Sequence, residues 1–349
     1  MAHLVETMAW AGKKPWHKLG AEVSNDLTPE EMAQAAGIDW LVEKRPIFIQ
    51  TNDGGFIAVP DQFGLTRATD DKVLDVVGRL YKPVQNVEAL DFFKRFVQAG
   101  DMTMETAGSL DGGRRIWGLA AIQDGFTLSG GDRVEGYLLL CSPHKQGEAF
   151  TVKLTSVRVV CNNTLTASLN GGGASWRMSH VYNFDQNMRD AATVALGLAR
   201  DRMIEFRDKA EFLSEARVRE SQHLIEYVAT LSGSKILETA VEESEALNGG
   251  SVLDAVIASS NGASITREIR ETDLNRAGRQ ILESILTSPG ADLPSARGTW
   301  WGALNGVTHA VDHVIGRNDD TRLTSAWFGD RATLKQQAVE LAVEYAGRN

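Results

Sequence analysis

Two histidines and an aspartate lie close together near the C-terminal end of the chain, in the segment TWWGALNGVTHAVDH at 299–313. His309 and His313 are four residues apart, so on a helix they would share one face and could bind a metal together. A zinc-protease helix also needs a glutamate directly after the first histidine as general base, and this chain has Ala310 there. An apolar stripe at three- or four-residue spacing runs beside the histidines: Trp300, Leu304, Val307, Val311 and Val314. We therefore interpret 299–315 as a packing helix with structural histidines, and we predict no metal site.

Other catalytic motifs are not found in the sequence. It contains no G-x-S-x-G nucleophile turn and no G-x-x-x-x-G-K-[ST] phosphate loop. The glycines of GSLDGGRRIWG at 108–118 precede strand-forming residues, which is typical of a hairpin turn. Cys161 could act as a nucleophile with His180, but it ends the apolar run VRVVC, where a buried, inert thiol is more common. We identify no catalytic residues and expect no cofactor.

The most unusual local chemistry lies in KLTSVRVVCNNTL at 153–165. Strict strand alternation would direct Lys153 and every second residue after it outward together, and would leave Arg158 on the other face. Asn162 and Asn163 then stand where a helix could begin, and a helix N-terminus favours anions such as phosphate. The alternative is that both asparagines are plain capping residues.

Positive charge is concentrated in the middle of the chain. Residues 110–180 contain seven Lys/Arg and five Asp/Glu, so their net charge is +2 and the rest of the chain carries −12. Arg114 and Arg115 follow a predicted turn, where two arginines are also common as ordinary solvated charge. The candidate nucleic-acid-binding residues are Arg114, Arg115, Lys145, Lys153, Asn162 and Asn163.

The bulk composition is that of a globular protein. With 349 residues, 43% hydrophobic and 23% charged, the chain can bury a substantial core. A net charge of −10 argues against a polycation that coats duplex DNA. No apolar run reaches the roughly 18 residues of a membrane span, and we expect no membrane contact and a cytoplasmic location. Cys141 and Cys161 both follow strand-like apolar residues, so we expect two free thiols.

The elements that must position these residues change in type along the chain. Thr28-Pro29-Glu30-Glu31 has the form of a capping box, so a short helix should begin there. The segment SWRMSHVY at 175–182 could be a further strand or a linker. Hairpins are predicted at 44–60, 104–122 and 132–160, and short helices at 70–80, at 87–98 and from the two asparagines. Longer helices are predicted at 187–218, 221–246, 265–288, 299–315 and 331–345.

This order of elements predicts an α+β fold, in which an antiparallel meander with packed helices is followed by a mainly helical part. We divide the chain into a mixed α/β segment at 1–100, a β-rich segment at 101–183 and a helical region at 184–349. Trp300, Trp301, Trp327 and Phe328 fall in the helical region. Base stacking by these rings is possible, but aromatic side chains in amphipathic helices more often pack in a core or an interface.

Three separated motifs together resemble a known family. They are PWHKLG at 15–20, VRVVCNNTL at 157–165, and GTWWGALNGVTHAVDH at 298–313 followed by RLTSAWFGDRATLKQQAVELA at 322–342. The resemblance covers almost the whole chain, and it is to phage- and plasmid-borne proteins catalogued as domain of unknown function 932, or phage/plasmid-like protein. It implies a mobile genetic element in the cytoplasm of a bacterial host, and it brings no established activity or residue roles.

At the level of fold alone, strand hairpins followed by a helix also resemble ring-forming single-strand annealing proteins. In those proteins a β-meander backed by a helix oligomerises and binds single-stranded DNA in a strongly basic groove. Residues 110–180 are only +2 here, but a ring can join a few cations per subunit into a continuous track. The leading hypothesis is therefore a phage or plasmid protein that binds single-stranded DNA as a homo-oligomer and could anneal it.

Three other classes of function stay open. A protein-binding factor could inhibit a host defence or replication enzyme through the acidic helical half, since residues 181–290 hold 18 Asp/Glu against 12 Lys/Arg. An enzyme would most sharply be a metal-assisted hydrolase at HAVDH. A role in virion structure or assembly is the third alternative.

Overall fold

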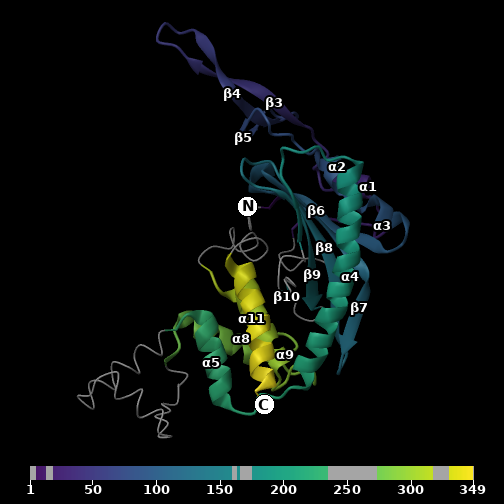
Figure 1. Ribbon diagram of the computed structural model, residues 1–349, viewed down its shortest axis with the longest axis vertical. Helices are drawn as coiled ribbons and strands as arrows, with labels where there is room; N and C mark the ends of the chain where they lie inside the picture. The colour runs from purple at the N-terminus through teal and green to yellow at the C-terminus, as the bar shows by residue number, and fades with distance from the viewer. Residues whose placement is uncertain are drawn as a thin grey trace, which may run out of the picture. The chain divides into compact units, whose positions relative to one another are not determined.

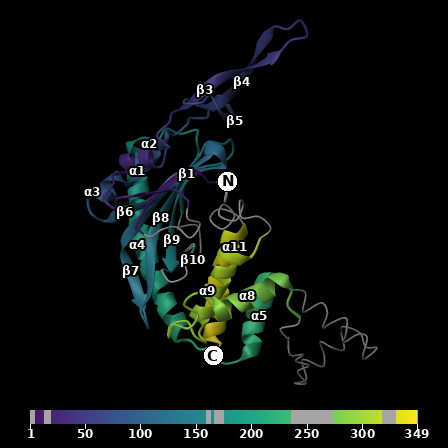
Figure 2. The same cartoon turned by 180° about the vertical axis from the view of Figure 1, so that it is seen from behind.

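The computed structural model describes residues 5–12, 19–158, 163–165, 175–234, 273–316 and 330–348. The chain divides into two compact units. Unit 1 comprises Met1–Thr127, Arg133–Arg207 and Asn318–Thr324, and unit 2 comprises Leu128–Asp132, Asp208–Arg317 and Ser325–Asn349. Figures 1 and 2 show their elements from two opposite sides. Strands predominate in the N-terminal part and helices in the C-terminal part, so the fold class is α+β as predicted.

A large sheet forms the centre of unit 1. Its strands follow the order β10-β9-β8-β7-β6-β1-β2, and β11 also pairs with β9. Strands β1 and β2 are parallel, whereas the pairs β1–β6, β6–β7, β8–β9, β9–β10 and β9–β11 are antiparallel. This arrangement confirms the hairpins predicted at 104–122 and 132–160. The strands are β1 (Val5–Ala11), β2 (Ala21–Val23), β6 (Met102–Leu110), β7 (Arg115–Leu128), β8 (Asp132–Pro143), β9 (Phe150–Arg158), β10 (Asn163–Leu165) and β11 (Ser175–Met178).

Close packing within this sheet depends on a glycine. A Cβ added at Gly108 of β6 would lie 2.3 Å from a ring carbon of Trp117 on β7 and 2.4 Å from the carbonyl oxygen of Thr7 on β1. Contacts this short do not occur between real Cβ atoms and their neighbours. The indole of Trp117, which is almost fully buried, therefore occupies the space that a side chain at 108 would fill.

Short helices cover part of the large sheet. Helix α1 (Pro29–Ala35) begins with the predicted capping box, in which Glu31 N donates to Thr28 Oγ1 at 3.2 Å and Thr28 N donates to Glu31 Oε2 at 2.8 Å. The helix predicted at 87–98 is present as three consecutive segments. These are α2 (Asn86–Leu90), the 3₁₀ turn η2 (Asp91–Phe93) and α3 (Lys94–Gln98). Phe93 and Leu90 lie against Gly118 of β7.

A second, three-stranded sheet has the order β3-β4-β5 and consists of β3 (Val42–Gln50), β4 (Phe56–Arg67) and β5 (Val73–Gly78). The hairpin predicted at 44–60 is confirmed, but the helix predicted at 70–80 is wrong because most of this segment is strand β5. Its buried residues Leu74 and Val77 are three apart, a spacing that also suits a helix. Backbone pairing with β4 and the valines, which favour strands, decide the outcome.

Helices form most of unit 2. They are α5 (Ser221–Ser232), α8 (Arg276–Thr287), α9 (Trp300–His309), the π-helical turn η5 (Ala310–Val314) and α11 (Asp330–Gly347). Helix α4 (Gln186–Glu215) begins in unit 1 and ends in unit 2. Trp300 stacks on Tyr345 at 5.3 Å between ring centroids and meets Tyr227 edge-on at 5.5 Å. The packing interpretation is thus confirmed for Trp300 and for the fully buried Trp301, whereas 327 and 328 lie outside the described residues.

Further predictions in the middle of the chain meet a mixed outcome. No helix begins at Asn163, because 163–165 form strand β10. The residues SWRM at 175–178 form strand β11, which selects the strand over the linker for this part of the segment. The outward direction predicted for Lys153 and every second residue after it is wrong at Thr155, which is buried, whereas Lys153 is partly exposed. Cys141 is a buried free thiol as predicted, and Cys161 lies outside the described residues.

Candidate functional site

Two of the predicted cations meet at one carboxylate. Arg115 begins β7, whereas Lys145 and Glu148 lie in the turn between β8 and β9. Arg115 donates to Glu148 from Nε at 2.8 Å and from Nη2 at 2.5 Å, and Lys145 Nζ lies 3.1 Å from Glu148 Oε1. Burial alone would raise the pKa of the Glu148 carboxyl, but the hydrogen bond and charge of Arg115, with Lys145, hold it below its ordinary value. Glu148 therefore stays ionised and fixes both cations in place.

Arg114 is held by a different contact. A tight turn, η3 (Asp111–Gly113), precedes it, and Asp111, Gly112 and Gly113 all have positive φ angles. From this turn Arg114 Nε donates to the carbonyl oxygen of Leu74 on β5 at 2.7 Å, and its Nη1 lies 3.9 Å from Asp111 Oδ2. The same neighbourhood holds Gln146, whose backbone N donates to Asp75 Oδ2 at 2.7 Å. Both turns thus join the large sheet to β5.

The cations differ in how far they reach into solvent. The side chains of Arg114 and Lys145 are 46% and 40% exposed, whereas that of Arg115 is 17% exposed. Since Arg115 also makes two hydrogen bonds to Glu148, its role is to hold the turn rather than to meet a ligand. Arg114 and Lys145 are the two cations of this group that can contact an anion.

Lys153 lies on β9, where its backbone is opposite Leu139 of β8 and Ser175 of β11. Burial raises the pKa of the nearby Cys141 thiol to about 12, and the charges of Arg115 and Lys153 oppose this rise while that of Glu148 adds to it. Arg115, Lys153 and Glu148 therefore all influence the ionisation of the Cys141 thiol on β8. Asn162 lies outside the described residues, and Asn163 is placed in strand β10, so 163–165 provide no helix N-terminus for an anion.

We call Arg114, Arg115, Lys145 and Lys153, with the carboxylates of Asp111 and Glu148, the cation cluster. Its four positive and two negative charges leave +2 on a chain whose net charge is −10. Four of the six predicted residues belong to this cluster, Asn162 and Asn163 do not, and Glu148, which joins Arg115 to Lys145, was not identified. The sequence did contain one indication of the contact with Glu148, because Lys145 and Glu148 are three residues apart.

A buried imidazole lies beside the cation cluster. His144 Nε2 is 2.7 Å from Asn86 Oδ1, and Asn86 Nδ2 donates to the carbonyl oxygen of Trp40 at 3.2 Å. The amide oxygen can only accept, so His144 carries a proton on Nε2. Burial lowers the pKa of His144 to about 3, with a smaller contribution from His180. Sequence reasoning missed this group, because nothing local in PHKQG indicates Asn86 as its partner.

The segment with which the sequence analysis began is buried in unit 2. Helix α9 and the turn η5 carry His309, Asp312 and His313, and the apolar stripe beside them is buried at Trp300, Leu304, Val307 and Val311. The two imidazole centroids are 5.0 Å apart. Asp312 Oδ1 is 2.8 Å from Nζ of the fully buried Lys335 on α11. The aspartate is therefore matched by a cation that the sequence could not indicate.

Metal binding finds no further support at these histidines. His309 Nδ1 is 3.4 Å from Ser284 Oγ, and burial followed by the charge of His313 lowers the pKa of His309. Within the described ranges, no group of three His, Cys, Asp or Glu side chains is placed to hold a metal ion. The packing-helix interpretation of 299–315 is confirmed by its burial.

A pocket of about 420 Å³ lies elsewhere in unit 1, between β1 and the end of α1. Glu6 is the ionisable residue among those that line it. Its carboxylate accepts two hydrogen bonds from Arg67, both at 3.1 Å, and one from Ser109 at 3.0 Å. These bonds already use the carboxylate, so the pocket offers mainly apolar and backbone surface.

Comparisons with known proteins identify a family and no function. No helix among the described residues is both long and apolar enough to cross a membrane. The comparisons with curated proteins and with solved structures each found no match. The family model described as "Domain of unknown function (DUF932)" matches residues 73–327, which is more than half of the chain and includes the whole cation cluster. The chain belongs to this family, as its motifs had indicated.

Proposed function

We propose that the protein binds the phosphate backbone of single-stranded DNA as an oligomer and serves strand annealing in a mobile genetic element. The observation that carries the proposal is the cation cluster, in which the exposed side chains of Arg114 and Lys145 lie on two adjoining turns of a chain whose net charge is −10. Phosphate contacts need cations that are both fixed and accessible. Lys145 is held by Glu148 and Arg114 by the carbonyl oxygen of Leu74, and both side chains are partly exposed.

The neighbouring architecture supports this use. Strands β6 to β9 form an antiparallel meander, and the unit 1 part of α4 packs on it through Phe206 against Phe126 and Met203 against Gly136. This is the strand-then-helix order on which the resemblance to annealing proteins rests (Figure 1). A cluster of +2 per subunit binds weakly by itself, so the proposal requires several subunits to align their clusters along one strand.

The test compares two pairs of substitutions that remove the same charge. Arg114→Gln/Lys145→Gln removes the exposed cations of the cluster. Arg95→Gln/Arg133→Gln removes two exposed, ion-paired arginines from elsewhere in unit 1. Fluorescence anisotropy of a labelled oligothymidine at about 50 mM salt should show at least a roughly tenfold loss of affinity for the first variant and little change for the control.

Salt dependence separates local contacts from overall charge. Each lost phosphate contact should reduce the slope of log K against log salt by about 0.7, so the Arg114→Gln/Lys145→Gln variant should lose about 1.4. Absence of binding by the wild-type protein at low salt would refute the proposal. Equal losses in the two variants would refute the assignment to the cation cluster. Either result would direct attention to a protein partner of the acidic segment 181–290.

A further inference from the structure

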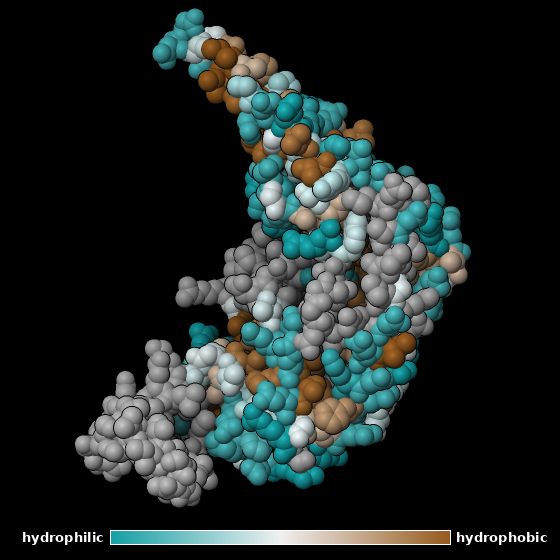
Figure 3. All heavy atoms as spheres, viewed as in Figure 1, coloured by the Kyte–Doolittle hydropathy of each residue, from teal (hydrophilic) through white to brown (hydrophobic). Residues whose placement is uncertain are grey.

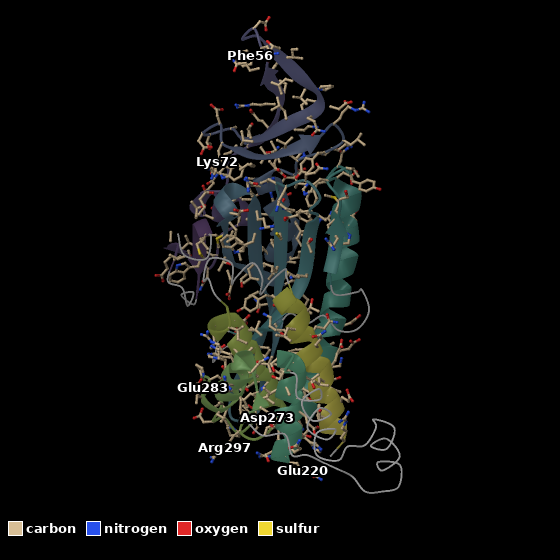
Figure 4. The ribbon with its side chains drawn as sticks, turned by 90° about the vertical axis from the view of Figure 1, so that its left-hand side faces the viewer. Phe56, Lys72, Glu220, Asp273, Glu283 and Arg297 are labelled. Atoms are coloured by element: carbon tan, nitrogen blue, oxygen red, sulfur yellow. The ribbon has the colours of Figure 1, made fainter. Side chains whose placement is uncertain are left out.

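The far halves of β3 and β4 form a two-stranded ribbon with an exposed apolar surface. We call residues 46–50 and 56–60 the apolar ribbon. Here Phe48 pairs with Ala58, Ile49 with Ile57 and Gln50 with Phe56, whereas β5 pairs with β4 only at Gln62 and beyond. Figure 1 shows the β3–β4 hairpin extending past β5, and Figure 4 places Phe56 near its far end. The ribbon therefore has no third strand to cover it within the described residues.

Both faces of the ribbon are apolar. Side chains alternate between faces along a strand, so Ile49 and Ile57 share one face while Phe48, Phe56 and Ala58 share the other. Phe48 is 54% exposed and Phe56 is 71% exposed, which together leave roughly 250 Å² of aromatic surface in water. Figure 3 shows hydrophobic side chains along this hairpin. Apolar patches of this kind on a folded protein usually mark an interaction surface.

The ribbon holds more of the exposed large hydrophobic side chains than its length alone would give. Thirteen such side chains are exposed among the described residues, and four of them, Phe48, Ile49, Phe56 and Ile57, lie in the ten residues of the ribbon. Two-stranded hairpins are marginally stable alone in water, so an uncovered apolar ribbon is an unfavourable isolated state. A partner that covers it removes this cost.

Charge favours a second copy of the chain as that partner. No Asp, Glu, Lys or Arg occurs in 46–50 or 56–60, although the chain carries −10. Most charges next to the ribbon are matched internally, because Arg45 pairs with Glu43 and Asp71, and Arg79 lies 3.4 Å from Asp61. The carboxylate of Asp53, in the turn that joins the two strands, accepts hydrogen bonds from Thr51 and from the backbone N of Gly55. Two acidic chains can thus meet along the strands without placing like charges together, provided that the two turns lie at opposite ends of the contact.

The local backbone favours a closed pair over an extended sheet. Pro46 has no backbone N–H to offer a further strand. The register between β3 and β4 shifts between Pro46 and Phe48, and Asp61 next to Pro60 has a φ of 57°. This irregularity separates the ribbon from the three-stranded part of the sheet. Face-to-face contact between two ribbons through the face of Phe48 and Phe56 is then a two-fold, self-complementary contact.

We propose that the apolar ribbon is the surface through which two copies of this chain associate, ribbon against ribbon. A standard interface buries about 800 Å² on each partner. The exposed side chains of Phe48, Phe56, Ile49 and Ile57 provide roughly 450 Å², so the contact belongs to the small, weak class of interfaces. This inference specifies a contact for the oligomer in the proposed function. Its biological role rests on that function, but the association itself requires no DNA.

The test measures mass in solution without DNA. Size-exclusion chromatography with light scattering compares the full-length protein with Phe48→Ser/Phe56→Ser and with a control, Phe212→Ser/Leu286→Ser, which changes two exposed apolar residues elsewhere. We expect the ribbon variant to have half the wild-type mass or less, and the control to keep the wild-type mass. All the replaced side chains are exposed, and equal urea midpoints at low protein concentration would show that each variant folds.

Two results would overturn the proposal. A wild-type protein that stays monomeric at tens of micromolar, or a ribbon variant with the wild-type mass, excludes association through this surface. Flotation of the wild-type protein with phosphatidylcholine vesicles, lost in the ribbon variant, would identify a lipid surface as the occupant instead. The oligonucleotide assay on the same proteins distinguishes this failure from that of DNA binding, because mass and affinity are measured separately.

Discussion

Acid should destabilise unit 1 through His144. This imidazole is fully buried, and burial lowers its pKa to about 3 in the folded protein. In the unfolded chain its pKa returns to about 6.5. Between these two values the unfolded state binds a proton that the folded state does not, so stability falls as the pH falls below about 6.5 and is fully present above it. The pKa of His180 is also lowered by burial, which adds a loss in the same direction.

The expected size follows from the two pKa values of His144. Lowering the pH from 7.5 to 5.5 carries the unfolded-state imidazole through most of one titration step, which costs about 1.4 kcal/mol of unfolding free energy. His144→Gln should remove this loss, because a glutamine amide can still donate to Asn86 Oδ1 but takes up no proton in this range. The variant keeps the smaller loss that arises from His180.

Urea unfolding followed by circular dichroism and tryptophan fluorescence measures the effect at pH 8.5, 7.5 and 5.5. The step from 8.5 to 7.5 serves as a control, since both values lie above the window and His144 should contribute no change there. A His144→Gln variant whose stability depends on pH as steeply as that of the wild-type protein would refute the reasoning. Such a result would mean that the folded state accommodates a charged imidazole at this position.

Two further predictions concern unit 2. Lys335→Met should lower the free energy of unfolding by about 3–5 kcal/mol, because it removes the ammonium group that lies 2.8 Å from the buried Asp312 carboxylate. The double variant Lys335→Met/Asp312→Leu should recover much of that loss. If urea unfolding of the two single variants and the double variant gives additive effects, the ion pair does not contribute. Gly306→Ala should destabilise the folded protein by at least about 1 kcal/mol, since a Cβ there would lie 2.4 Å from Ile285 Cα. The control is Gly197→Ala on α4, where an added Cβ meets no atom within 4 Å. That substitution should stabilise the folded protein by up to about 1 kcal/mol. Equal melting temperatures for the two alanine variants would contradict the close approach of α8 and α9.

Local sequence patterns predicted much of the fold. Thr28 and Glu31 indicated the start of α1 because a capping box is a contact between residues three apart. The hairpins were predicted for a similar reason, since their strands are adjacent in sequence. Val73 to Gly78 was mispredicted because the spacing of Leu74 and Val77 suits either a helix or a strand, and only pairing with β4 selects the strand. The helix start predicted at Asn163 was wrong for a similar reason, because pairing with Arg158 places Asn163 in strand β10.

The sequence analysis named the cations of the candidate site but not the residues that hold them in place. Arg114 and Arg115 were named from charge and turn position. That Glu148 joins Arg115 to Lys145 depends on residues 33 apart, and that Arg114 reaches Leu74 depends on residues 40 apart. The apolar ribbon was visible in the sequence as a hairpin, but its exposure was not, because the same residues would read identically in a covered sheet.

By itself, the sequence determined the α+β class, the hairpins, the packing helix at 299–315 and the family. These properties follow from periodicity, capping and motif order, which act over a few residues or need no contact. Only the tertiary structure decided that Lys335 meets Asp312, that His144 meets Asn86, and that the cation cluster forms where two turns reach β5. Burial makes such partners necessary, since an unpaired charge or polar group inside the protein is costly. Which residue serves as the partner depends on which elements fold side by side.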